Sequence, residues 1–223
     1  MLITGGKLIS SQEAKALLAP VLARHMAPRD LQIALDDELN FADEYDRSGV
    51  LLLPDGAAID GDLALDYECA EYDGKSFRGV LALGSLAVHG DILNANVDGG
   101  PFLAVLGPLT VRHIIKGGAP LIAAGPIISA GTIYCEYNHG SFRAWGGITA
   151  QGIVIDDQSY DISGPVSGIK VVLWQDDATQ YLLPEFFYEN DDGTLEANDD
   201  LSETLKARIR AGEPIFRDDA LGI

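Results

Sequence analysis

The sequence predicts a mainly β protein: a single-stranded parallel β-helix, or β-solenoid, of about six coils with helical or irregular caps at both ends. The first observation is a short phrase of Gly, any residue and an aliphatic, which occurs at Gly61-Asp62-Leu63, Gly84-Ser85-Leu86, Gly107-Pro108-Leu109, Gly125-Pro126-Ile127, Gly146-Gly147-Ile148 and Gly164-Pro165-Val166. Its glycines are 23, 23, 18, 21 and 18 residues apart. A period near ~20 residues is typical of a solenoid, in which each repeat buries its apolar side chains by stacking on its neighbours.

The second observation is that small and aliphatic residues alternate within each repeat, as in Leu81-Ala82-Leu83, which indicates strands. Frequent glycines disfavour helices. Turn signals recur between the phrases, at Asp73-Gly74, Gly99-Gly100, Gly117-Gly118 and His139-Gly140. We therefore expect one interior column of stacked aliphatics made of Leu63, Leu86, Leu109, Ile127, Ile148 and Val166.

The handedness of the coils can be interpreted in two ways. The steps of 18 residues fit the left-handed coils of hexapeptide-repeat proteins, but the steps of 21 and 23 residues do not. An aliphatic at every sixth position is not sustained either. The pattern favours a right-handed or irregular parallel solenoid.

Taken in order, the chain divides into an N-terminal capping segment at 1–58, the solenoid at 59–173 and an acidic C-terminal cap at 174–223. Ser10 and Glu13 have the spacing of a capping box at a helix start, and Pro20 predicts a kink or a break in that helix.

The C-terminal cap carries nearly half of the net negative charge. Residues 176–223 contain thirteen acids and four bases. We expect a helix at about 201–211, capped by Asp199 or Asp200 and ended by Gly212.

Composition bounds the class of protein. The chain has 223 residues, a net charge of −19 and a pI near 4.3. The negative electrostatic field of such a chain disfavours binding to nucleic acid and anionic membranes and favours binding to basic partners. A net negative charge can also serve solubility alone. No apolar run is long enough for a membrane span and the start has no secretory pattern, so we expect a cytoplasmic protein. Cys69 and Cys135 are expected to be free, buried thiols.

The chain lacks the common nucleophile, phosphate-binding and zinc motifs, and its four histidines share no ligand spacing. Cys135 and His139 are four residues apart, but spacing alone does not make a catalytic pair. No cofactor, metal or catalytic residue is therefore predicted. Clustered carboxylates leave open a carbohydrate-active β-helix enzyme as a third alternative.

The repeat resembles the bactofilin-like, polymer-forming β-solenoid proteins of bacteria, through coils such as GSLAVHGDI, GPLTVRHII and GGITAQGIVI. The long acidic segments at both ends depart from that family. The stretches FLAVLGPLTVRHII and IISAGTIYCEYNHGSFRAWGGI also look like small solenoid immunity proteins of polymorphic toxin systems.

This second resemblance implies a non-enzymatic, acidic immunity protein that occludes the active surface of a cognate, basic bacterial toxin. A self-assembling structural scaffold is the alternative. For the immunity protein we expect a monomer or small homo-oligomer. The predicted partner-binding residues are Asp36, Asp37, Glu38, Asp43, Glu44, Asp176, Asp177, Asp191 and Asp192.

Overall fold

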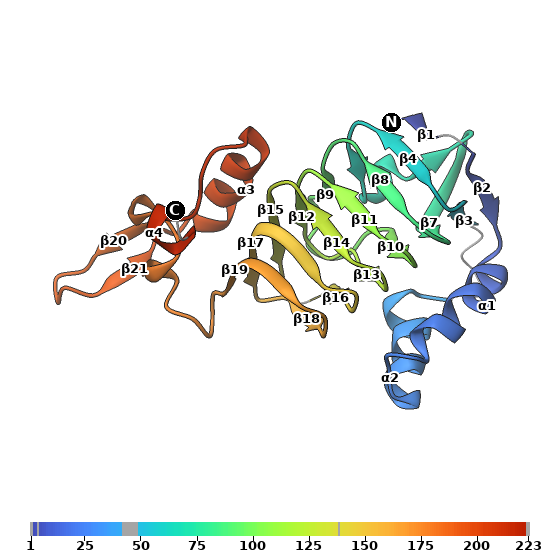
Figure 1. The fold of residues 1–223 in the computed structure, drawn as a ribbon, viewed down its shortest axis with the longest axis horizontal. Helices are drawn as coiled ribbons and strands as arrows, with labels where there is room; N and C mark the ends of the chain where they lie inside the picture. Colours follow the sequence, from blue (N-terminus) through green and yellow to red (C-terminus); the bar gives the residue numbers. More distant parts are fainter. Residues whose placement is uncertain (1, 4, 42–48, 138, 222–223) are drawn as a thin grey trace.

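The computed structural model describes residues 2–3, 5–41, 49–137 and 139–221 (Figure 1). The predicted site residues Asp43 and Glu44 lie outside these residues. Within them the protein is mainly β, and its centre is a parallel β-solenoid of about five turns, which confirms the prediction of a mainly β solenoid with some helices.

Each turn of the solenoid visits three faces in the same order, named here faces A, B and C. Face A consists of β3 (Gly49–Leu53), β7 (Lys75–Ala82), β10 (Phe102–Val105), β13 (Leu121–Ala123), β16 (Ser141–Ala144) and β18 (Ser159–Ile162). Face B consists of β4 (Ala57–Asp60), β8 (Leu86–Val88), β11 (Leu109–Val111), β14 (Ile127–Ser129) and the first residues of β17 (Ile148–Asp156) and β19 (Val166–Val172). Face C consists of β5 (Leu63–Ala64), β9 (Ile92–Asn94), β12 (Ile114–Lys116), β15 (Thr132–Glu136) and the ends of β17 and β19.

The stacking register shows which residues share an interior column. On face B, Leu86, Leu109, Ile127, Ile148 and Val166 pair in succession, as predicted, although Val166 in the last coil is 37% exposed and not interior. The placement of Leu63 in that column was wrong. Leu63 pairs with Ile92 on face C, because Gly61 lies at the corner between faces B and C whereas the later key glycines lie between faces A and B.

The corner between faces A and B explains why the repeat requires glycine. A Cβ on Gly125 would lie 2.3 Å from the carbonyl carbon of Gly107, and one on Gly146 would lie 2.2 Å from that of Gly125. Real Cβ atoms do not approach backbone that closely. The glycines therefore stack directly on one another and let successive coils meet at the normal strand spacing.

The N-terminal segment contains β1 (Leu2–Ile3), β2 (Lys7–Ile9), α1 (Ser11–Leu22), α2 (Pro28–Ile33) and the π-helical turn η1 (Ala34–Glu38). Its strand β1 pairs with β4 of face B and β2 pairs with β3 of face A, whereas its helical part packs on the outside of face A. The Ser10–Glu13 capping box is present at the start of α1, and Pro20 lies inside that helix. Leu18 and Leu22 of α1 are buried in one cluster with Leu81 and Ile122 of face A.

The short elements between β5 and β7 are the 3-10 turn η2 (Tyr67–Cys69) and β6 (Glu71–Tyr72), which pairs with β7 in an antiparallel hairpin. Both cysteines are free, as predicted. Cys135 is buried in β15, but Cys69 is exposed. Its expected burial was wrong because its segment turns at η2 and does not continue as a core strand.

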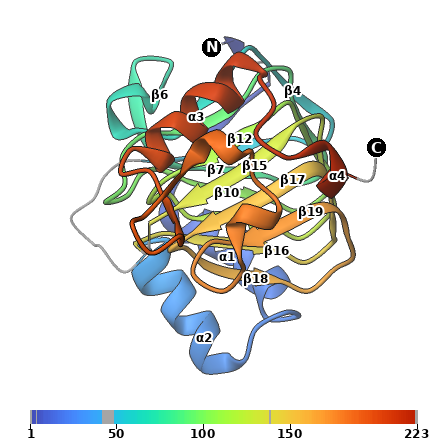
Figure 2. The same cartoon turned by 90° about the vertical axis from the view of Figure 1, so that its left-hand side faces the viewer.

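The C-terminal segment packs on the outside of face C. It contains η3 (Ala178–Gln180), η4 (Pro184–Phe186), β20 (Phe187–Glu189), β21 (Leu195–Ala197), α3 (Leu201–Ala211) and α4 (Asp218–Leu221). Leu205 and Ile209 of α3 are buried with Tyr134 and Val154 of face C. Figure 2 shows α3 and α2 on different sides of the stacked strands.

Face B has no such cover. Its outward side chains form one row, partly or fully exposed along its length: Ala58, Ala87, Thr110, Ile128, Thr149 and Ser167. Among the described residues, the helices are all too short or too polar to cross a bilayer.

Candidate functional site

The N-terminal predicted site residues are largely engaged within the protein. Asp36 Oδ1 lies 2.8 Å from Lys15 Nζ, and this hydrogen bond lowers the pKa of the carboxyl. Glu38 accepts from the Arg143 guanidinium at 2.6 Å and from the Ser141 hydroxyl at 2.8 Å. Asp37 is exposed beside them. Asp36 and Glu38 therefore hold η1 in place, and their charges are already matched.

The C-terminal predicted site residues shape turns and face solvent. Asp176 accepts the backbone N–H of Val172 at 2.7 Å, and Asp177 caps η3 by accepting from Thr179. Asp192 accepts from the backbone and hydroxyl of Thr194, which lowers the pKa of its carboxyl. No Lys or Arg in the described residues is ion-paired to these carboxylates.

The two predicted groups do not form one surface. In Figure 1, η1 follows α2 at one end of the molecule, whereas the β20–β21 hairpin extends from the other end. A single partner domain of ordinary size contacts one patch of about 800 Å². The predicted residues therefore define two separate candidate surfaces, and the C-terminal one is the more accessible to a partner.

The hairpin joins acidic charge to exposed apolar side chains. Tyr188 is 44% exposed and Leu195 is 55% exposed, and both lie in its two strands. The sequence predicts an acidic cap here, but it did not lead us to assign Tyr188 or Leu195 to a site. Residues 171–205 contain ten Asp or Glu and no Lys or Arg. An exposed aromatic and an aliphatic within a field of one sign are typical of a protein-binding surface.

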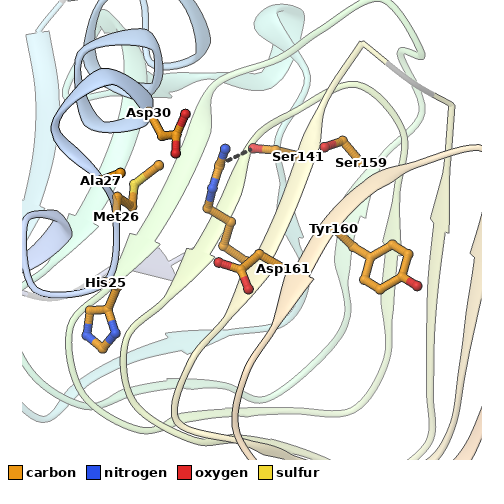
Figure 3. Close-up of a pocket in the computed structure, with 9 residues that line it drawn as sticks. His25, Met26, Ala27, Asp30, Ser141, Ser159, Tyr160 and Asp161 are labelled. Atoms are coloured by element: carbon orange, nitrogen blue, oxygen red, sulfur yellow. Dashed lines mark hydrogen bonds between the residues drawn. The ribbon is translucent and has the colours of Figure 1, made fainter.

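A pocket of about 260 Å³ lies between the N-terminal helices and the last strands of face A (Figure 3). Met26, Ala27 and Asp30 line one side, and the strands β16 and β18 line the other with Ser141, Arg143, Ser159, Tyr160 and Asp161.

The polar groups of this pocket are largely paired with one another. The His25 ring stacks on Trp145 with centroids 4.3 Å apart, and the Trp145 indole N–H donates to Asp161 at 2.8 Å. Arg143 binds Glu38 through both terminal nitrogens. The arrangement joins the N-terminal segment to face A, and the carboxylate that the Ser141 hydroxyl contacts, Glu38, is itself ion-paired with Arg143.

Other groups with catalytic potential are not assembled either. Cys135 is buried, and burial raises the pKa of its thiol to about 12. His139 lies 3.4 Å from Asp98 and packs edge-on against Tyr137. In the part of the chain that the structure describes, no three His, Cys, Asp or Glu side chains are grouped to hold a metal ion.

No protein-family model, curated protein or solved structure matches this chain.

Proposed function

We propose that the chain is a non-enzymatic protein-binding module whose binding element is the C-terminal hairpin, β20–β21. Most concretely, it is an immunity protein that acts in the cytoplasm and neutralises a cognate, basic bacterial toxin by covering its active surface. The observation that carries this proposal is the exposure of Tyr188 and Leu195 on a projecting hairpin within an acidic segment.

A two-stranded hairpin is marginally stable by itself, so a projecting one gains order when a partner packs on it. The ten acids of residues 171–205 attract a basic partner and speed its association, while Tyr188 provides the large amphipathic contact that dominates many interfaces. Asp191 and Asp192 at the hairpin tip are the predicted site residues that best fit this role.

The experiment is co-expression of the chain with the product of the neighbouring gene in a bacterial host. We expect a stable complex and protection from the toxicity of that product. The double variant Asp191→Asn/Asp192→Asn should slow association about tenfold at low salt, with a smaller effect at high salt. The control variant Glu68→Gln/Glu71→Gln removes two exposed charges near β6 and should leave association unchanged.

Absence of a complex and of protection would contradict the proposal. Equal effects of the two double variants would also contradict it, because they would show that only the net charge matters.

A self-assembling scaffold, as in bactofilin-like proteins, is the second candidate. One observation favours it: in the described residues, β18 and β19 end the parallel stack without pairing to a further strand. Such an edge is a template for another chain. This candidate requires filaments or large oligomers in size-exclusion chromatography, whereas the immunity protein is a monomer or small homo-oligomer. For either candidate function, we also propose that the solenoid is right-handed and has about six coils.

A further inference from the structure

A second cavity, of about 360 Å³, lies where the corner between faces B and C meets the C-terminal strap, residues 212–221. Its volume is within the range of small-molecule sites. The solenoid provides Arg112, His113 and Gln151, and the strap provides an apolar wall that includes Phe216 and Leu221. None of these residues takes part in the proposed hairpin interface.

A ladder of side chains at this corner fixes the tautomer of His113. Asp62 accepts the backbone N–H of Asp91 at 2.8 Å, and Asp91 accepts that of His113 at 3.2 Å. One coil further, His113 Nδ1 accepts the backbone N–H of Thr132 at 3.0 Å. An imidazole that accepts at Nδ1 carries its proton at Nε2. Burial also lowers the pKa of His113, which keeps the ring neutral at neutral pH.

His113 is therefore a fixed donor with a free hydrogen-bonding position. Its side chain is largely enclosed, because the residue is only 8% exposed, and it lines the cavity. No described residue hydrogen-bonds to Nε2. Because no buried side-chain nitrogen in the described residues lacks a partner, this Nε2–H is open to the cavity, where it offers a position that an acceptor would fill.

Arg112 adds positive charge next to this donor. Its Nε and Nη2 each donate to Asp91 at 2.7 Å, which fixes the plane of the guanidinium. Nη1 has no acceptor among the described residues and remains available to a ligand. Gln151, an exposed residue on the same corner, brings a further amide.

The apolar wall is held rigidly. A Cβ on Gly152 would lie 2.2 Å from the Phe216 ring, so this ring occupies the space that a side chain at position 152 would take. The backbone N–H of Leu183 donates to Ile215 at 3.0 Å, and that of Arg217 donates to Tyr181 at 2.9 Å. The wall is thus formed before any ligand arrives, which lowers the entropic cost of binding.

We propose that this cavity binds a small organic carboxylate with an apolar body. The carboxylate oxygens accept from His113 Nε2–H and Arg112 Nη1, and the apolar body packs on Phe216 and Leu221. A monoanion fits better than a phosphate, because Glu213 lines the same cavity and the chain has a net charge of −19.

The test is a titration of the full chain with benzoate, followed by the imidazole ¹⁵N and Nε2–H NMR signals of His113. We expect a saturable shift of these signals. Benzamide has the same shape without the charge and should bind at least about tenfold more weakly, because charge-assisted hydrogen bonds are the stronger ones.

Two variants separate the cavity from general effects of the surface. Ala130→Trp fills the cavity from an exposed position and should abolish the benzoate response. Thr149→Trp places the same side chain on exposed face B outside the cavity and should leave it unchanged. No saturable His113 response, equal binding of benzamide, or equal effects of the two variants would each overturn the proposal.

Discussion

The glycine corner between faces A and B gives the most quantitative prediction, the effect of Gly125→Ala. The added Cβ would lie 2.3 Å from both the carbonyl carbon and the oxygen of Gly107, and 2.8 Å from the nitrogen of Pro108. These are backbone atoms of the adjacent coil, which cannot rotate away as a side chain would. Overpacking of a dense interior costs about 1–3 kcal/mol, and we expect the upper end because backbone must shift.

The assay is thermal and urea unfolding followed by circular dichroism. A loss of about 3 kcal/mol corresponds to a decrease in Tm of about 6–12 °C for a chain of this size. Gly99→Ala is the matched control, because the nearest atom to its Cβ would be 3.9 Å away. That variant should be neutral or stabilised by up to about 1 kcal/mol. A Gly125→Ala protein within about 0.5 kcal/mol of the parent would refute the stacked-glycine reasoning.

Two further predictions concern the buried polar groups on face C. Burial lowers the pKa of Lys116 from 10.5 to about 8, so between these values the unfolded chain binds more protons and stability rises with pH. Urea unfolding of the parent and Lys116→Met at pH 7.5 and 9.5 should show the parent gaining up to about 1.4 kcal/mol per pH unit relative to the variant, and parallel curves would contradict this. The Tyr134 hydroxyl lies 2.9 Å from Asp156 Oδ2 and 2.8 Å from Ser202 Oγ. Tyr134→Phe should cost about 1–3 kcal/mol and speed amide exchange in α3, and unchanged exchange there would contradict the role of this contact in docking the helix.

The solenoid could be predicted because its glycines obey a local steric rule. From Gly107 to Gly164, a Cβ at the A–B corner would meet the glycine of the neighbouring coil, so the pattern is visible in the sequence alone. The wrong placement of Leu63 in the face B column also arises from these corner glycines. The B–C corner also uses glycine, at Gly61, Gly90 and Gly131, and a Gly-x-aliphatic phrase does not say at which corner it lies.

The candidate site was less predictable because charge pairing is a tertiary property. Asp36 is paired with Lys15, 21 residues away, and Glu38 with Arg143, 105 residues away. No local pattern distinguishes these engaged acids from the exposed ones of the hairpin. The His113 cavity was missed for the same reason, since the solenoid corner and the strap that form it are far apart in the sequence.

The central claim, that the β20–β21 hairpin is the partner-binding element, is tested most directly by amide hydrogen exchange of the chain with and without the neighbouring gene product. We expect the largest gain in protection at residues 187–197, with face B and the N-terminal helices unchanged. Protection confined to face B or to the β18 edge, with an unchanged hairpin, would contradict it.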